Sequence, residues 1–410
     1  MTRMIFAHRW MRCCTVSSGV VRIVFIAPFA YAPKATVSAR MMPMAKALAR
    51  RGHTVHILVP PYDNPAHSGV IWEEDGVRVI NMRVRAGASG FATYASLARQ
   101  LVQHVRQLKP EVLHVFKPVG VGALAMLALP PPFVDNDDWE GRGGWVDVNP
   151  YSPAQRLMMI WQERWALRRA RAVTCASEAL VMRTQVLRGR CDAVLMLPNG
   201  PDFQLRAQVA EAESRRAALR RAFGWDGNMP MLIYAGTVPR NHDLDVAVRA
   251  LAELVDRPWR WVIIASGDGV SDLQAQITRL HLDARVEWHA FMPRAQLVER
   301  LVAADIALYP YRDTPINRAK CSGKVVDYMA CGKPMVVSDV GMNRIYLDGG
   351  RCGMLTPPGD ALAFRDALRY LLEHPHEALA LGRAAQAYLW AHFDWSERVG
   401  ALEALYAQHA

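Results

Sequence analysis

The chain has 410 residues, of which 51% are hydrophobic and 21% are charged, a composition that is typical of folded globular proteins and excludes disorder, collagen and coiled coils. At about 150 residues per domain, this length predicts two or three domains. The net charge of +11 is unevenly placed, with +12 in residues 1–200 and −1 in residues 201–410, so we expect the two halves to bind different partners.

The cysteines and the first residues bear on the compartment. Seven scattered cysteines without a C-x-x-C pair predict a reducing environment and no structural zinc site. No uncharged apolar stretch reaches the ~18 residues of a spanning helix. The first thirty residues resemble a signal peptide, but Arg22 interrupts the apolar run, and cleavage there would remove the first strand. We therefore expect a dispensable leader at 1–20 and a cytoplasmic protein whose membrane contact, at the inner face of the plasma membrane, is peripheral.

Short apolar segments alternate with longer helical patterns in the first half of the chain, which predicts a parallel α/β sheet. The expected helices are Ser38–Arg51, which ends before Gly52, and Phe91–Leu108. The expected strands, in chain order, are Val21–Ala27, Thr54–Pro60, Val77–Met82, Val112–Phe116, Phe133–Asp135 and Ala172–Ala176.

The segment Leu195–Asp202, rich in Pro and Gly, interrupts this pattern and is interpreted as a hinge. The alternation then restarts, with expected strands at Met231–Ala235, Trp261–Ser266, Val286–His289, Ile306–Tyr309, Met335–Ser338 and Gly353–Leu355. The sequence therefore predicts two doubly wound sheets with a boundary near residue 200.

Ligands of open α/β sheets bind outside the carboxyl ends of the strands, so the residues that follow each strand are candidates. The first such loop holds Lys34 and Arg40 ahead of a helix; it either binds an anion or is a solvated loop. No G-x-G-x-x-G follows the first strand, which disfavours hydride transfer on a dinucleotide. Gly236 and Gly267 follow strands of the second half, where a tight turn alone explains a glycine.

The segment Arg318–Gly341 holds the strongest candidates. Lys320 and Lys324 precede or open a short helix, where two ammonium groups and a helix N-terminus would attract a diphosphate. Asp327 lies one turn further along, where its carboxylate could accept hydrogen bonds from a ribose. The alternative is a surface helix with an Asp–Lys pair.

Two segments of the first half suggest an acceptor site and a membrane contact. The loop Asp135–Trp145 combines carboxylates with tryptophan, a pairing that recognises sugars, or else it is a structural loop with Trp packed on the core. The helix Ala154–Arg171 carries five arginines among tryptophans, which suits an anionic lipid surface or a solvated helix with snorkelling side chains.

Seven segments in order resemble the retaining, nucleotide-sugar-dependent glycosyltransferases of family 4. They are RGHTVHILVP (51–60), EVLHVF (111–116), TCASEAL (174–180), LPNGPD (197–202), YAGTVPRNHDLDVAVRAL (234–251), DYMACGKPMVVSDVG (327–341) and DWSERVGALEALY (394–406). The resemblance covers nearly the whole chain from Val21. It implies the GT-B fold, with an acceptor-binding domain at 21–200, a donor-binding domain at 201–380, and a C-terminal helix at 381–410 that crosses back to the first domain.

The resemblance also implies an activity and a set of site residues. The expected reaction moves a sugar from a nucleoside-diphosphate sugar to a hydroxyl of a lipid-linked or envelope-glycan acceptor, with retention and without a metal or other cofactor. The catalytic candidates are Lys324, Asp327 and His114. The donor-binding candidates are Gly236, Thr237, Arg240, His242, Gly267, Phe291, Met292, Lys320, Ser322 and Gly323, with the base held near Phe291 and Met292. The acceptor-binding candidates are Lys34, Arg40, Asp137, Asp138, Trp139 and Glu140.

The sequence departs from the family pattern at the donor site. The first carboxylate of the family's E-x7-E pattern is replaced by Ala319, and the usual donor-phosphate Arg by Thr237, with Arg240 as a stand-in. The alternatives are a nucleotide-sugar 2-epimerase of the same fold and a non-catalytic subunit. A nucleic-acid-binding protein, suggested by the basic charge, is disfavoured because no reading motif is present.

Overall fold

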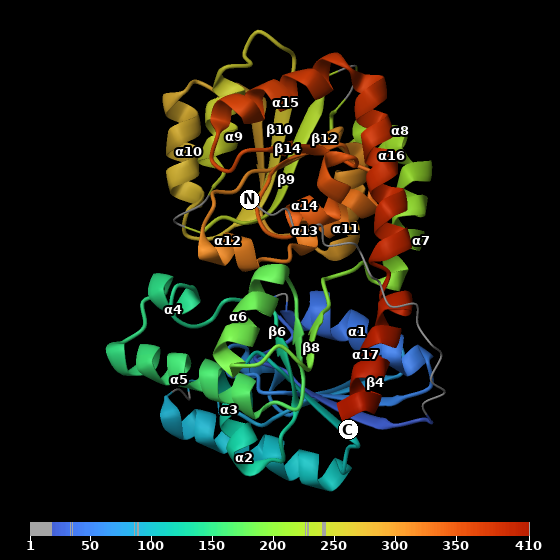
Figure 1. Cartoon of the computed structure of the whole chain (residues 1–410). Coiled ribbons are helices and arrows are strands. Elements are labelled where there is room, and N and C mark those ends of the chain that lie inside the picture. Colours follow the sequence, from blue (N-terminus) through green and yellow to red (C-terminus); the bar gives the residue numbers. More distant parts are fainter. Residues whose placement is uncertain are drawn as a thin grey trace, which may run out of the picture.

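The computed structural model describes residues 19–409, apart from positions 33, 35, 86, 88, 89, 226, 228 and 240–242. Of the expected leader at 1–20, residues 1–18 lie outside the described residues. The described chain forms two lobes, one above the other in Figure 1, each built on its own sheet. We call them the N-lobe, which holds β1–β8, and the C-lobe, which holds β9–β14.

The N-lobe sheet has eight strands in the order β3-β4-β2-β1-β5-β6-β7-β8, parallel except for the β3–β4 pair. The strands are β1 (Arg22–Ile26), β2 (Thr54–Val59), β3 (Ile71–Glu74), β4 (Val77–Asn81), β5 (Val112–Phe116), β6 (Phe133–Asn136), β7 (Val173–Cys175) and β8 (Val194–Met196). The helices are α1 (Met42–Arg50), α2 (Phe91–Leu108), α3 (Gly120–Ala125), α4 (Trp145–Val148), α5 (Pro153–Arg169) and α6 (Glu178–Arg188).

The C-lobe sheet has six parallel strands in the order β11-β10-β9-β12-β13-β14. The strands are β9 (Met231–Thr237), β10 (Arg260–Ser266), β11 (Val286–His289), β12 (Ile306–Tyr309), β13 (Met335–Ser338) and β14 (Met354–Thr356). The helices are α7 (Phe203–Ser214), α8 (Arg216–Ala222), α9 (Asp245–Ala252), α10 (Val270–Arg279), α11 (Arg294–Ala303), α12 (Pro315–Ala319), α13 (Gly323–Ala330), α14 (Asn343–Tyr346), α15 (Ala361–Glu373) and α16 (Pro375–His392).

The chain returns to the N-lobe at its end. Helix α16 packs on α13 of the C-lobe, and α17 (Trp395–His409) packs on α1 of the N-lobe, as Figure 1 shows. Val399, Leu402 and Tyr406 of α17 join the apolar cluster that contains Phe25 of β1. The expected crossing of the C-terminal helix is therefore confirmed, and burial of this apolar face holds it in place.

Most expected strands are present within one or two residues of their expected ends, but two N-lobe strands were not predicted. Strand β3 pairs antiparallel with β4 through a two-residue turn at Asp75 and Gly76, both with positive φ. Strand β8 occupies the start of the segment expected to be irregular. The expected helix Ser38–Arg51 begins as a π-helical turn at Val37–Met41 before α1.

The change of sheet falls between β8 and β9, an interval that contains residue 200; the expected domain limits stay predictions. Both sheets turn the carboxyl ends of their parallel strands toward the region where the lobes meet. Among the residues described, no helix combines the length and the apolar character needed to cross a bilayer. No group of metal-ligating side chains large enough to hold an ion is found in the same part of the chain.

Candidate functional site

The N-terminus of α13 lies against the end of β9 in the C-lobe. Ser322 caps α13, because its hydroxyl accepts a hydrogen bond from the backbone N–H of Lys324 at 3.3 Å. The side chain of Lys324 crosses directly over Gly236, where an added β-carbon would overlap it. The predicted donor residues Gly236, Ser322 and Gly323 are therefore brought together with the predicted catalytic residue Lys324. A β-carbon at position 236 would displace the Lys324 side chain.

Lys324 carries a charge that nothing in the described chain neutralises. Its Nζ lies 5.9 Å from the ring centre of Tyr309 and makes no hydrogen bond or ion pair with the described residues. Burial and the nearby charge of Lys320 together lower its pKa to about 8, although the charge of Asp327 opposes them. An unpaired ammonium beside a helix N-terminus is suited to bind an anion.

The second predicted lysine, Lys320, lies where the two lobes meet. Its Nζ donates to Oδ1 of Asn317 at 2.9 Å and lies 4.5 Å from the ring centre of Tyr311. The ring of Trp145, from the N-lobe, is 5.9 Å away. Burial lowers the pKa of Lys320 as well. The two lysines thus raise the positive potential on the C-lobe side of the junction.

Buried tyrosines hold this arrangement in place, and the sequence analysis did not select them. The hydroxyl of Tyr309 donates to Oγ of Ser322 at 2.6 Å and also contacts that of Tyr311. The hydroxyl of Tyr328 accepts from the backbone N–H of Ala235 at 2.9 Å. These phenols fix the end of β9 and the cap of α13. Their sequence signal is weak, because a tyrosine in or beside an apolar strand or helix face is typical of a core residue.

Asp327 does not present a free carboxylate. Both of its oxygens accept from the guanidinium of Arg294, at 2.6 Å and 2.5 Å, and its side chain is 15% exposed. Burial lowers the pKa of Arg294, but the charge of Asp327 and their hydrogen bonds raise it above its usual value overall. Arg294 begins α11 and was not predicted, because nothing in its local sequence distinguishes it from a solvated arginine.

The remaining donor candidates lie at the carboxyl edge of the C-lobe sheet or in its loops. Thr237 ends β9 and is exposed. Gly267 follows β10 with φ of 128° and packs so closely on Val238 that a β-carbon would overlap its carbonyl oxygen. Phe291 is 82% exposed after β11, and Met292 is half-buried. Arg240 and His242 lie outside the described residues.

The acidic loop of the N-lobe gathers around one lysine. Lys117, which follows β5 with a positive φ, pairs with Asp138 at 2.7 Å, Glu140 at 2.5 Å and Asp137 at 3.2 Å. Burial raises the pKa of Asp137 to about 7, although the charge of Lys117 opposes this. Three predicted acceptor residues are thus brought together, and Lys117, which the sequence analysis missed, joins them.

The other acceptor candidates take different positions. Arg40 is buried and binds both oxygens of Asp135 at 2.7 Å, so it is part of the interior. Lys34 is half-exposed and lies 3.4 Å from Asp63. The indole N–H of Trp139 donates to the Arg142 carbonyl at 2.8 Å, and its ring lies under the guanidinium of Arg183. The packed structural loop is therefore the better description of Trp139.

The structure removes His114 from the candidate site. His114 is fully buried in β5, where Nδ1 contacts the hydroxyl of Tyr406 at 2.7 Å and Nε2 contacts Oγ1 of Thr174 at 3.3 Å. Burial lowers its pKa to about 4, so the ring is neutral at pH 7. Its place in the middle of the strand, with Tyr406 of α17 against its ring, leaves none of its surface exposed.

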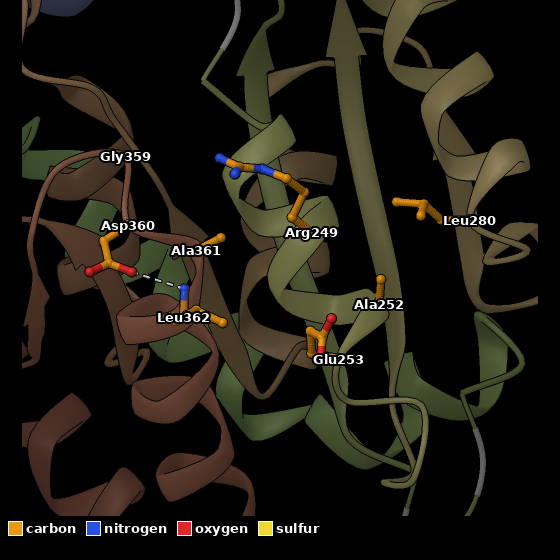
Figure 2. Close-up of a pocket in the computed structure, with 8 residues that line it drawn as sticks. All are labelled: Arg249, Ala252, Glu253, Leu280, Gly359, Asp360, Ala361 and Leu362. Atoms are coloured by element: carbon orange, nitrogen blue, oxygen red, sulfur yellow. Dashed lines mark hydrogen bonds between the residues drawn. The ribbon is translucent and has the colours of Figure 1, made fainter.

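Two further surface features are the exposed apolar side chains of α5 and α6 and a pocket in the C-lobe. Leu157 and Trp161 of α5 are 70% and 49% exposed, beside Met182 and Val186 of the adjacent α6, which are also exposed. The pocket of Figure 2, with a volume of about 420 Å³, lies on the flank of the C-lobe and contains none of the predicted site residues. Its lining residues are Arg249, Ala252, Glu253, Leu280, Gly359, Asp360, Ala361 and Leu362.

Comparison with known proteins gives a match in each lobe. Residues 36–200 match the family described as glycosyl transferase 4-like domain, and residues 229–374 match the family described as glycosyl transferases group 1. Over 257 residues the chain is 27% identical to the 2-deoxystreptamine glucosyltransferase of Streptomyces kanamyceticus. That match covers 61% of this chain and 65% of the relative, so the chain spans less than two thirds of that protein's length.

Solved structures resemble the whole described chain. Sucrose-phosphate synthase from Thermosynechococcus elongatus superposes with a TM-score of 0.74 at 19% identity, covering 95% of this chain and 98% of that one. HepE from Anabaena, solved in complex with UDP-glucose, gives a TM-score of 0.70 at 19% identity, with 95% and 100% covered. These likenesses show the fold: two Rossmann-like domains that face each other, the GT-B arrangement expected from the sequence.

Proposed function

We propose that this chain transfers a sugar from a nucleoside-diphosphate sugar to an acceptor hydroxyl. The proposal is supported by the matches of residues 36–200 to the glycosyl transferase 4-like domain and of residues 229–374 to the glycosyl transferases group 1 family. The observation that carries the proposal is the unneutralised Lys324 at the N-terminus of α13, pressed against Gly236. A cation kept without a partner in a half-buried position is costly unless an anion arrives to pair with it.

The diphosphate is the anion that this site suits. As the bond between the sugar carbon and the β-phosphate oxygen breaks, negative charge develops on that phosphate. Lys324, the first N–H groups of α13 and the neighbouring Lys320 would stabilise this charge. The acceptor oxygen forms the new bond on the same face of the sugar, and the leaving diphosphate takes up the acceptor proton. We expect these cationic groups to supply the charge neutralisation, so that no metal is needed.

The rest of the donor would extend over the carboxyl edge of the C-lobe sheet. Each carboxylate oxygen has two lone pairs, so Asp327 can hold a ribose hydroxyl while Arg294 binds both oxygens. Phe291, which is exposed and lies three residues before Arg294 in the sequence, offers an aromatic face for the base. We keep Arg240 and His242 as proposed phosphate-binding residues.

The acceptor would bind at the N-lobe side of the junction. Asp137, Asp138 and Glu140 cluster on Lys117 near the carboxyl ends of β5 and β6, and their oxygens can accept hydrogen bonds from sugar hydroxyls. We propose a glycan or lipid-linked acceptor of the cell envelope. The exposed Leu157 and Trp161 among the arginines of α5 support a peripheral contact with anionic lipid at the inner face of the plasma membrane. Retention of configuration is proposed from the family that the sequence resembles.

The test is to incubate the protein with a panel of nucleotide sugars and to measure nucleoside-diphosphate release, with and without a lipid extract. We expect release from one donor, stimulated by the extract. Release of a 2-epimeric sugar would favour an epimerase. Absence of release and of nucleotide binding would contradict the proposal and favour a non-catalytic subunit. That alternative is supported by Ala319, which is buried and occupies the position of a carboxylate in the family pattern.

A further inference from the structure

The linker between the lobes contains one side chain that is bound to both of them. Oδ1 of Asn199 accepts a hydrogen bond from Nη1 of Arg40 in the N-lobe at 2.9 Å. Its Nδ2 donates to the carbonyl oxygen of Cys321 in the C-lobe at 2.6 Å. Its side chain is therefore satisfied on one side by each lobe.

The backbone of Asn199 is engaged in the same way. Its N–H donates to Sγ of Cys321 at 3.1 Å, and its carbonyl oxygen accepts from the hydroxyl of Tyr346 at 2.8 Å. That hydroxyl also contacts Sγ of Cys321 at 3.0 Å. Two polar atoms of Asn199 thus bind Cys321, one its carbonyl oxygen and one its Sγ, while the other two bind Arg40 and Tyr346.

The two ends of this connection lie next to the two halves of the candidate site. Cys321 directly precedes Ser322, the residue that caps α13, and lies three residues before Lys324. At the other end, Arg40 is held by both oxygens of Asp135 at 2.7 Å. Asp135 lies two residues before Asp137 in the sequence, and Asp137 belongs to the carboxylate cluster on Lys117.

We propose that Asn199 is a positioning residue that sets the N-terminus of α13, and Lys324 with it, at a fixed place relative to the acceptor loop of the N-lobe. This inference rests on the proposed function, because it concerns the alignment of donor and acceptor. Transfer requires the reacting atoms to approach within about 3–3.5 Å, so a small shift of α13 against the acceptor loop is expected to lower the rate strongly.

Asn199→Ala removes both side-chain bonds, whereas Asn199→Asp keeps an acceptor for Arg40 and places an oxygen against the Cys321 carbonyl. Both variants are expected to weaken binding of the nucleoside diphosphate about fivefold to tenfold, since one or two hydrogen bonds no longer hold the site. Both are also expected to lower kcat for transfer more than they raise the donor KM. The matched control is Gln204→Ala, which removes another hydrogen bond between the lobes, 3.2 Å to Asp75, at an exposed position that makes no hydrogen bond to Cys321 or Tyr346 in the described chain.

The experiment measures two quantities in each variant. Calorimetric titration gives the affinity for UDP, GDP and ADP, and hydrogen exchange gives the exchange rates of the backbone amides of residues 321–326. Exchange is expected to quicken in Asn199→Ala and Asn199→Asp without any nucleotide and to stay unchanged in Gln204→Ala. Folded variants with wild-type exchange and wild-type nucleotide affinity would overturn the proposal. If the wild-type chain binds none of the three nucleotides, the proposed function fails, while the exchange result still decides the positioning role.

A variant that leaves the backbone of the linker intact covers the case in which the Asn199 variants do not fold. Tyr346→Phe removes only a hydroxyl, and with it the bonds to the Asn199 carbonyl and to Cys321. A rise in exchange at 321–326 supports the positioning role. Exchange that remains at the wild-type rate in this folded variant contradicts it.

Discussion

Two lysines that lie near the carboxyl ends of strands, one in each lobe, have opposite surroundings. Lys117 follows β5 in the N-lobe and is paired with three carboxylates, which raise its pKa well above the usual value although burial lowers it. Lys324 opens α13 in the C-lobe, where burial and Lys320 lower its pKa to about 8 although the charge of Asp327 opposes them. No carboxylate of the described chain forms an ion pair with its Nζ.

The two lysines therefore have different roles. The charge of Lys117 is neutralised by ion pairs that hold three carboxylates together. Oxygen atoms of this cluster can still accept hydrogen bonds. At Lys324 the charge remains available, and the cost of leaving it unpaired is recovered when an anion binds. We therefore expect changes at Lys324 to affect donor binding and changes at Lys117 to affect mainly stability.

The largest expected effect is that of Lys324→Met on turnover. Loss of the cation at the developing phosphate charge is expected to lower kcat/KM about 100-fold to 1,000-fold, the range found for removal of one such stabilising group. Steady-state kinetics with the donor identified by the panel measure it. Lys109→Met, at the end of α2, removes an exposed lysine far from the lobe junction and is the control. A loss below threefold in Lys324→Met would erase the contrast between the two lysines.

The corresponding change in the N-lobe, Lys117→Met, is expected to act on folding. It leaves Asp137, Asp138 and Glu140 together without their cation, and breaking a buried ion pair on one side costs about 3–5 kcal/mol. Urea unfolding at pH 8 measures this loss. Because the pKa of Asp137 is about 7, the loss is expected to be smaller at pH 6, where protonation removes part of the repulsion. A stability equal to that of the wild type at pH 8 would mean that the cluster is not held by Lys117.

The Asp327–Arg294 pair is expected to have an intermediate effect on the donor. Asp327→Ala should raise the donor KM about tenfold, since one or two hydrogen bonds to the ribose are lost. Arg294→Ala should raise it about threefold, because the guanidinium only orients the carboxylate. A fall in KM on removal of Arg294 would show instead that Arg294 competes with the nucleotide for Asp327.

The expected effect of pH on donor affinity is smaller than that of Asp327→Ala. In the free protein Lys324 is protonated below its pKa of about 8 and loses its charge above it. Since only the charged form attracts the diphosphate, affinity is expected to be full below pH 7 and to fall about fivefold between pH 8 and pH 9. Calorimetric titration across this range measures it. Lys324→Met should show no such fall, whereas Lys320→Met should move it to higher pH, because the charge of Lys320 lowers the pKa of Lys324. A fall that persists in Lys324→Met would assign the titration to another group.

The sequence predicted local features better than distant pairings. Strands such as Ile306–Tyr309 and Met335–Ser338 were predicted to the residue because short, largely apolar runs mark buried parallel strands. Strand β3 was missed because Ile71 and Trp72 are followed at once by two glutamates. Its Asp75–Gly76 turn is, in retrospect, a recognisable hairpin signal.

The same limit applies to the site. The short segment from Lys320 to Asp327 is local, and its residues were found. Lys117, Arg294 and Asn199 were missed because each acquires its role only from partners far along the chain, such as Asp327 for Arg294. His114 was assigned a role from its motif alone, whereas its burial under α17, which begins almost 300 residues later, decides its environment.

The central claim is that α13 and Lys324 bind the diphosphate of the donor. The most direct measurement is a crystal structure of the protein soaked with uridine or guanosine diphosphate. We predict a diphosphate within hydrogen-bonding distance of Nζ of Lys324 and of the first N–H groups of α13, with the ribose toward Asp327. A nucleotide bound at a place that neither residue reaches would contradict the account.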